Sequence, residues 1–365
     1  MVLSGGFKTI SIAVDHHIHD KSFIMDIVVL PYEVLSVVPC VDFEISFISL
    51  QLDELLDNPD FRLVHVSELG MSLISPREHK ERILKEGYRC ISHLWGKTPL
   101  EWKDHGIEGV PWRVRLGEDK RDKLRQIFEH YGGYWWMDVF CTDQEVVNKP
   151  LSIMGDVYRN CVECVCMLDI KIPKLFQQPC ETWSKNFRTL IAHMIDVVEC
   201  KWSKRVWTFQ EWMLPPKVCY TEETVNNEYL YLIDRHDLNK ITTGRGIWWI
   251  INAIIRIKPA TLVTTTFDAD RSFEGVITHL MKSGRKCMKP EDYYYGIAGV
   301  LEIQLTDGLP FDEVEEQFLS RLERIYDNNR YIIGKSSPEK QVYKQWKMKK
   351  GGYGIFIRFL YNYVI

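Results

Sequence analysis

Two kinds of hydrophobic pattern alternate along the middle of the chain. Short continuous apolar runs predict buried strands, and longer segments with apolar side chains at helical spacing predict helices. Because the two kinds alternate, we expect an α/β fold in which a mostly parallel sheet is flanked by helices on both faces. The expected strands are residues 90–94, 135–140, 162–168 and 218–221, and the expected helices are residues 117–131, 153–160 and 202–214.

A turn signal marks the expected start of this α/β core. Asp57-Asn58-Pro59-Asp60 combines residue types that favour tight turns and cannot continue a helix or a strand. We therefore expect residues 1–60 to form an N-terminal extension, with strand-like runs such as residues 24–30. Residues 61–221 are expected to form the core itself.

The pattern changes after the last expected strand. Residues 222–330 are expected to form a helical part packed on the core, with helical spacing at 246–257 and 311–326. Residues 331–365 are first basic and then aromatic and aliphatic. We expect this C-terminal segment to pack within the fold; contact with a neighbouring subunit and weak binding to a membrane surface are the alternatives.

Composition narrows the class of protein. The chain has 365 residues, of which 45% are hydrophobic and 26% charged, so it is long enough for a large packed core. The formal net charge of −4 argues against general nucleic-acid binding. The N-terminus does not resemble a signal peptide, and no apolar run is long enough for a transmembrane segment. We expect a cytoplasmic protein with reduced thiols.

Several suggestive clusters are better explained without a ligand. His16, His17 and His19 resemble metal ligands, but no partner cluster with zinc-like spacing lies nearby, so no metal site is expected. The cysteines at 161, 164 and 166 lie in and around an apolar run, where buried structural thiols are the better explanation. Serine-hydrolase elbows, Walker A loops and dinucleotide-binding fingerprints do not occur. No bound cofactor is therefore expected.

The most informative segment is residues 205–211, Arg-Val-Trp-Thr-Phe-Gln-Glu. On a helix, Trp207 and Glu211 share a face, and Gln210 flanks them. An aromatic wall beside a carboxylate suits a flat, cationic, sugar-linked ligand. Arg205 is a candidate for binding a phosphate or an acid, or is a surface cation. The alternative is that Trp207 belongs to the core and Glu211 to a solvated helix face.

Further candidates follow the first two strands of the core. In an open parallel sheet, ligands bind beyond the carboxyl ends of the strands. Ser92 and His93 are candidates for binding ribose or phosphate, Trp95 for stacking on a base, and Gly96 for close backbone approach. Asp138 follows the second strand at the same edge. Each also has a structural explanation, such as backbone capping for Ser92 and Asp138, or core packing for Trp95.

Five motifs follow one another in a fixed order. They are FRLVHV at 61–66, YRCISHLWG at 88–96, YWWMDVFCTDQ at 134–144, RVWTFQE at 205–211 and RKCMKPEDYYYGIAG at 285–299. Together they resemble the fungal heterokaryon-incompatibility (HET) domain, and the resemblance spans residues 61–300. Three small departures, Met137, Thr142 and Val206, remove no functional group. The resemblance implies that residues 61–221 are the HET domain, and Asp292, Tyr295 and Gly299 match a downstream helical motif with a structural role.

A fainter resemblance, to TIR domains, bears on the chemistry. The element order is similar to that of these flavodoxin-like domains, and Trp207 and Glu211 have the spacing of the plant-type W-C-x-x-E motif. The resemblance implies a TIR-like domain that cleaves NAD⁺ as a substrate, with Glu211 as the catalytic carboxylate. The two resemblances together imply a role in fungal non-self recognition, innate immunity and programmed cell death, with homo-oligomerisation on activation by an unknown protein partner. The alternative is a non-enzymatic adaptor that assembles and recruits partners.

The proposed chemistry needs one carboxylate. Nicotinamide in NAD⁺ is already a cationic leaving group, so no general acid is required, and an anion that stabilises the developing ribosyl cation is enough. A glutamate with an ordinary pKa of about 4.3 is ionised at neutral pH. We therefore expect Glu211 to act as an anion without any adjustment of its pKa.

Overall fold

The computed structural model describes residues 8–14, 23–29, 52–96, 100–145, 150–173, 189, 192–193, 196–197, 199–225, 232–234 and 285–329. The expected helix at 246–257, the segment 331–365 and the histidines at 16, 17 and 19 lie outside these residues. A separate antiparallel hairpin, β1 (Lys8–Val14) with β2 (Phe23–Val29), confirms the strand expected near residues 24–30.

The described core is built on an eight-stranded mixed sheet in the order β12-β11-β10-β5-β9-β3-β4-β7. The four central strands are parallel to one another, and antiparallel pairs join β12 to β11 and link β9, β3 and β4. The expected α/β class with a largely parallel sheet is confirmed. The strands are β3 (Leu63–Ser67), β4 (Gly70–Ile74), β5 (Arg89–Ser92), β7 (Ile107–Glu108), β9 (Gly133–Trp136), β10 (Glu163–Leu168), β11 (Val218–Glu222) and β12 (Ile233–Asp234).

The order of the parallel strands fixes where a ligand would bind. Along the chain they run β5, β9, β10, β11, whereas across the sheet they lie β9-β5-β10-β11. This is the 2-1-3-4 order of flavodoxin-like folds. The crossovers from β5 and from β9 therefore lead to opposite sides of β5. In such sheets the ligand crevice lies at this switch point, beyond the carboxyl ends of the strands on either side, here β5 and β10.

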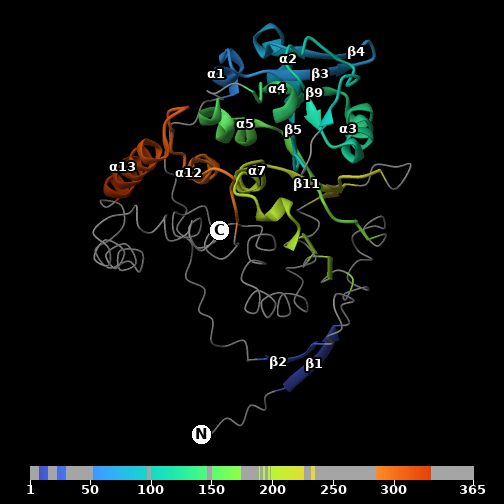
Figure 1. Cartoon of the computed structure of the whole chain (residues 1–365), viewed down its shortest axis with the longest axis vertical. Coiled ribbons are helices and arrows are strands. Elements are labelled where there is room, and N and C mark those ends of the chain that lie inside the picture. Colours follow the sequence, from blue (N-terminus) through green and yellow to red (C-terminus); the bar gives the residue numbers. More distant parts are fainter. Residues whose placement is uncertain are drawn as a thin grey trace.

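Helices cover both faces of the sheet, as the alternating pattern predicts. Figure 1 shows α3 on one side and α5, α7, α12 and α13 on the other. The helices are α1 (Leu52–Asp57), α2 (Lys80–Glu86), α3 (Glu118–Tyr131), α4 (Asp138–Cys141), α5 (Met154–Asn160), α7 (Thr208–Met213), α12 (Pro290–Ala298) and α13 (Phe311–Asn329). Short 3₁₀ turns η2 (Pro76–His79), η3 (Leu151–Ile153) and η6 (Trp202–Lys204), and a small pair of strands, β6 (Leu100–Glu101) with β8 (Arg115–Leu116), complete the described elements.

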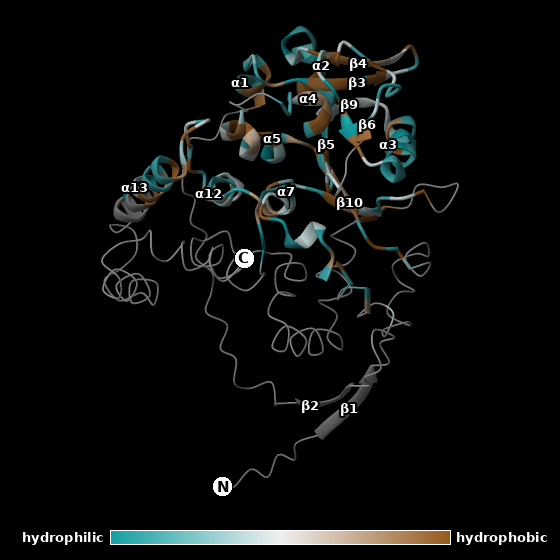
Figure 2. Ribbon diagram, in the orientation of Figure 1, coloured by the Kyte–Doolittle hydropathy of each residue, from teal (hydrophilic) through white to brown (hydrophobic). Residues whose placement is uncertain are grey.

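Burial follows the hydrophobic pattern. All six residues of β10 are buried, which explains the continuous apolar run there, and Figure 2 shows hydrophobic strands beneath helices with hydrophilic outer faces. The cysteines at 161, 164 and 166 are buried and free, in agreement with structural thiols. None of the helices within the described residues is long and apolar enough to cross a membrane.

Two expected elements are interrupted. The strand expected at 135–140 ends at Trp136, because Asp138 begins the short helix α4 with its Oδ1 accepting the amide of Val139 at 2.8 Å. The helix expected at 202–214 is split into η6 and α7 by an extended residue, Arg205. The cause is a backbone bridge from Arg205 to Lys286, a residue far along the chain.

The downstream helical motif packs on the core through two glycines. A Cβ atom built on Gly299 would lie 2.6 Å from the Cα of Gly155 on α5, so no side chain fits at either position. Arg159 secures the same contact by donating to the Gly299 carbonyl at 2.7 Å. The structural role expected for Gly299 is therefore close helix approach, which holds α12 against α5.

Candidate functional site

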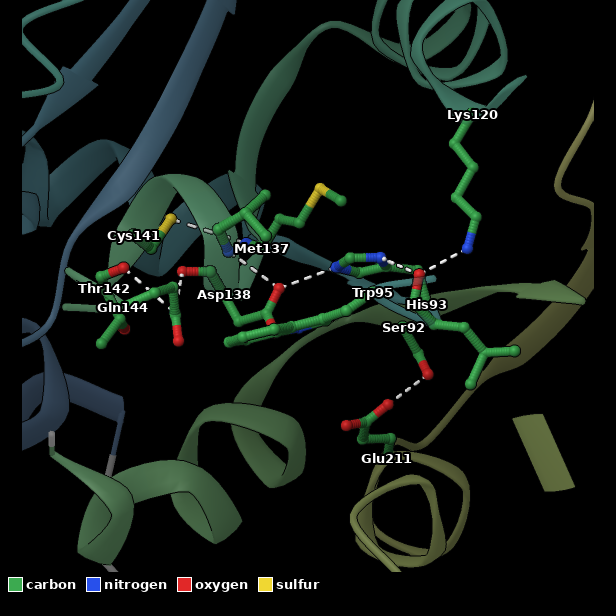
Figure 3. Close-up of polar contacts among 12 residues, drawn as sticks. Ser92, His93, Trp95, Lys120, Met137, Asp138, Cys141, Thr142, Gln144 and Glu211 are labelled. Carbon is green, nitrogen blue, oxygen red and sulfur yellow. Dashed lines mark hydrogen bonds and ion pairs between the residues drawn. The ribbon is translucent and has the colours of Figure 1, made fainter. Parts of the chain in front are cut away.

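Ser92 and Glu211 meet at the carboxyl end of β5. Ser92 is the last residue of that strand, and Glu211 lies in α7. The two residues are 1% and 8% exposed, respectively. The Trp202 indole Nε1 donates to Ser92 Oγ at 2.7 Å. Because that bond occupies Ser92 as an acceptor, the hydroxyl donates its own hydrogen to Glu211 Oε2, a contact drawn in Figure 3.

Glu211 is a buried carboxylate without a cationic partner at ion-pair distance among the described residues. Burial raises its pKa to about 7, with the nearby Asp138 acting in the same direction; Ser92, Arg205 and His93 oppose part of the rise. The expectation of an ordinary pKa is therefore wrong. The sequence showed the carboxylate beside an aromatic residue, but not that a single hydroxyl would be its hydrogen-bond partner.

Asp138 gathers two of the other candidates. Its Oδ1 accepts from His93 Nε2 at 2.8 Å, and its Oδ2 accepts from the Trp95 indole at 2.6 Å. Burial alone would raise the pKa of Asp138, but His93, Trp95 and Arg205 outweigh it and hold the pKa below its ordinary value. Asp138 is thus an ionised anchor that joins the end of β5 to the start of α4 (Figure 3).

The hydrogen bonds of His93 fix the position of its ring. Nδ1 lies 3.0 Å from the Leu94 carbonyl oxygen, and Nε2 lies 2.8 Å from Asp138 Oδ1. Both ring nitrogens are therefore engaged within the chain.

Lys120 supports the same strand end. From α3 its ammonium donates to the Leu94 carbonyl, and it forms an ion pair with Glu223 at 2.8 Å. Lys120 is 3% exposed. The sequence does not indicate this role of Lys120, because nothing in a charged amphipathic helix distinguishes one buried lysine from its solvated neighbours. It does not indicate the role of Trp202 either, because a tryptophan in an apolar segment is typical of a core residue.

The remaining candidates differ in where they point. Arg205 donates to the His93 carbonyl at 3.3 Å and so lies at the site. Trp207 hydrogen-bonds Asp292 of α12, a contact that opposes part of the burial-driven rise in the pKa of that carboxyl. The buried Gln210 amide lies against Gly299, where a built Cβ would approach its Oε1 to 2.7 Å. Trp207 and Gln210 thus contact α12.

Gly96 has a conformational reason to be glycine. Its φ is +83°, in the left-handed region that other residues rarely adopt, and no atom lies within 4 Å of a built Cβ. The structure brings Ser92, His93, Trp95, Asp138, Arg205 and Glu211 together around the ends of β5 and β9.

A buried thiol lies beside the site. Cys141, the last residue of α4, is 2% exposed, and burial raises its pKa to about 12. Within the described part of the chain, no group of three or more histidine, cysteine, aspartate or glutamate residues is placed to hold a metal ion.

Comparisons with known proteins agree with the motifs. Residues 88–211 match the family described as "Heterokaryon incompatibility protein (HET)". The chain is similar to the vegetative incompatibility protein HET-E-1 of Podospora anserina, with 23% identity over 240 residues, which are 64% of this chain and 16% of that relative. The match thus spans under a fifth of the relative's length. No solved structure matches. Residues 88–211 of this chain therefore carry a match to the HET family.

Proposed function

We propose that this HET domain hydrolyses NAD⁺ at the bond between nicotinamide and ribose, with Glu211 as the catalytic carboxylate. The C1′–N bond breaks, and its electron pair neutralises the pyridinium ring, so nicotinamide leaves without being protonated. Water then adds to C1′ and releases one proton, giving an ADP-ribose product. Glu211 stabilises the positive charge that develops on the ribose before water adds.

The observation that carries this proposal is a buried carboxylate without a charge partner at the ligand-binding end of the sheet. Glu211 contacts the last residue of β5, beside the switch point between β5 and β10 at which the strand order reverses and ligands bind in such folds. Burying a carboxylate without a cation costs stability, and such groups cluster at functional sites. A cationic ribosyl group would supply the missing positive charge.

Glu211 also retains an oxygen for a ligand. Ser92 binds Oε2, and no group among the described residues hydrogen-bonds Oε1. A ribose hydroxyl could donate to Oε1 while Ser92 holds the carboxylate in place. His93 and Asp138, already bonded to each other and to the backbone, serve this arrangement by fixing the strand end. Arg205, with a single hydrogen bond, is the side chain we assign to the NAD⁺ diphosphate.

The biological role follows from the family. A HET domain, and a relative named for vegetative incompatibility, support a role in fungal non-self recognition that ends in cell death. Loss of NAD⁺ would be the lethal step. We expect the domain to assemble with copies of itself on activation by a protein partner. An adaptor without enzymatic activity is the alternative that the following experiment distinguishes.

The test is nicotinamide release from NAD⁺ by purified protein, with a concentrated or crosslinked sample included to permit assembly. Glu211→Gln keeps the shape of the side chain but removes its charge, so we expect a loss of about a hundredfold or more in rate. Glu211→Asp should also be severely impaired, because it withdraws the carboxylate by one methylene.

Glu163→Gln is the matched control. Glu163 is a buried glutamate at the opposite end of the same strands, so its replacement should leave the rate within a few fold of wild type. In a fungal host, wild type should trigger cell death and Glu211→Gln should not. Equal killing by both proteins would reject NAD⁺ cleavage through Glu211 and favour the adaptor.

A further inference from the structure

Arg285 is a buried cation that has no carboxylate partner among the residues that the structure describes. It is 1% exposed, and its Nη1 donates to the Arg205 carbonyl and to Thr208 Oγ1, both at 2.7 Å. Its Cζ lies 5.2 Å from the centre of the Phe209 ring. Within the described part of the chain, Arg285 forms no ion pair and its Nε has no hydrogen-bond partner. Burying a guanidinium without a charged partner costs folding free energy, so its presence here needs an explanation.

The first reason is geometric. The Arg285 side chain donates hydrogen bonds to the turn that leads into α7. Its neighbour Lys286 forms backbone hydrogen bonds with the same turn. The Val206 amide donates to the Lys286 carbonyl at 3.0 Å, and the Lys286 amide donates to the Lys204 carbonyl at 2.6 Å. This bridge begins α7 at Thr208, one turn before Glu211. The position of the carboxylate therefore depends on a segment far downstream.

A chain of hydrogen bonds leads from Arg285 to the Glu211 carboxylate. Thr208 Oγ1 accepts from Arg285 and donates to the Trp202 carbonyl at 2.6 Å. The Trp202 indole donates to Ser92 Oγ, and Ser92 donates to Glu211. Every link is buried. A change at Arg285 would consequently reach Glu211 through its helix and through its hydrogen-bond partner.

The second reason is charge. Burial lowers the pKa of Arg285 to about 10, and Glu211 is among the groups that oppose this fall, so the guanidinium stays protonated at neutral pH. Arg285 and Glu211 are thus opposite buried charges without ion-pair partners of their own. The pKa of Glu211 is affected by Ser92, His93, Asp138 and Arg205 from the surrounding elements. Glu211 in turn affects the pKa values of Cys90, Tyr158 and Arg285. The pKa of Arg285 is also affected by Cys200, Tyr220 and Tyr293.

We propose that Arg285 is a positioning residue of this site, which fixes the turn before α7 and places there a buried positive charge that favours the ionised form of Glu211. Its catalytic meaning rests on the proposed NAD⁺ hydrolysis, whereas its pairing with Glu211 does not. The catalytic unit then extends beyond residues 88–211 to include the segment that begins at Arg285.

The first arm of the test is the pH profile of nicotinamide release by wild type, Arg285→Met and Arg285→Lys. Arg285→Met removes the charge, so the midpoint pH should rise by about one unit or more, with a tenfold loss at pH 6.5 that largely recovers at pH 9. Arg285→Lys keeps the charge, so the midpoint should stay while the rate falls modestly. Equal losses at every pH in both variants would show a purely structural role and overturn the proposal.

The second arm needs no turnover. Urea unfolding of wild type, Arg285→Met, Glu211→Gln and the double variant gives the coupling between the two side chains at pH 5 and at pH 8.5. At pH 8.5 the unfolding constants should depart from additivity by tenfold or more, and at pH 5, where Glu211 is protonated, they should be nearly additive. Additivity at both pH values would overturn the proposal.

The two arms separate the two hypotheses. Coupling without any nicotinamide release by wild type would reject NAD⁺ hydrolysis and support the charge pairing. If Arg285→Met is unfolded at pH 8.5, adding Glu211→Gln should restore folding, because it removes the opposite buried charge. Failure of that rescue contradicts the pairing.

Discussion

A buried glutamate lies at each end of strands β5 and β10, and the two carboxylates have opposite kinds of partner. At the amino end, Glu163 pairs with Arg89 at 3.3 Å and Lys217 at 2.8 Å, and accepts from the Cys219 thiol at 3.0 Å. At the carboxyl end, the Ser92 hydroxyl is the one hydrogen-bond partner of the Glu211 side chain among the described residues. The exposed fractions are similar, 4% and 8%, so burial does not explain the contrast.

The contrast separates a structural acid from a functional one. Burial alone would raise the pKa of Glu163, but Lys217, Cys219 and Arg89 hold it below the ordinary value. Burial raises the pKa of Glu211 to about 7 because its partners are weaker. Glu163 therefore supports the fold at neutral pH, whereas Glu211 opposes it. A fold retains an unfavourable group of this kind where its chemistry is used.

The largest expected effect on stability comes from removing the Glu211 charge. The folded-state pKa is above the unfolded value of about 4.5, so wild type loses stability as pH rises from there through about 7. Glu211→Gln does not pay this cost and should be more stable at pH 8.5 by on the order of 3 kcal/mol. At pH 4.5 the two proteins should be similar. Urea unfolding at several pH values measures the difference, and a gain of the same size at every pH would contradict the assignment.

Glu163→Gln should have the opposite sign and a smaller size. Its removal leaves Arg89 and Lys217 without their carboxylate, but their side chains are 28% and 48% exposed and can be solvated. We expect a loss of about 1–2 kcal/mol at pH 7, less than for a fully buried pair. Because the Glu163 pKa is lowered, this loss should shrink as pH falls below 4.5 towards the folded value.

A pH-independent loss of the same size in Glu163→Gln would show that packing, and not charge, sets its contribution. Nicotinamide release serves as the second readout on the same sample. The structural assignment expects a rate near that of wild type. A loss comparable to that of Glu211→Gln would remove the distinction between the two ends of the sheet.

Local sequence was sufficient for most of the fold. The apolar run at residues 164–168 is buried over its whole length, and the amphipathic pattern of residues 118–131 places one face on the sheet. Spacing alone thus identified the parallel strands and the helices that connect them. It also placed Ser92 and Asp138 at neighbouring strand ends, because parallel strands end at one edge.

Sequence was insufficient where distant residues decide. The helix expected at 202–214 breaks because Lys286 pairs with Arg205, which no local pattern shows. The pKa of Glu211 depends on burial and on a serine more than a hundred residues away. In the sequence Trp202 looks like an ordinary core aromatic residue, whereas in the structure its indole donates a hydrogen bond to Ser92. These effects are tertiary, and they concentrate at the candidate site.

The smallest expected effect tests how the weak partner of Glu211 is itself held. Trp202→Phe removes the donor to Ser92 while keeping most of the ring, so the Ser92 hydroxyl becomes free to rotate away from the carboxylate. We expect a loss of about 1 kcal/mol in transition-state stabilisation, roughly fivefold in rate, and a higher midpoint pH for nicotinamide release. Trp212→Phe is the matched control, since its indole donates to the Tyr220 hydroxyl at 2.8 Å in the same core. Both variants lose a buried indole hydrogen bond and similar packing, so their stabilities should fall alike. Only Trp202→Phe should move the midpoint, and an equal shift in both would mean that general loosening of the core, and not the Ser92 contact, sets the ionisation of Glu211.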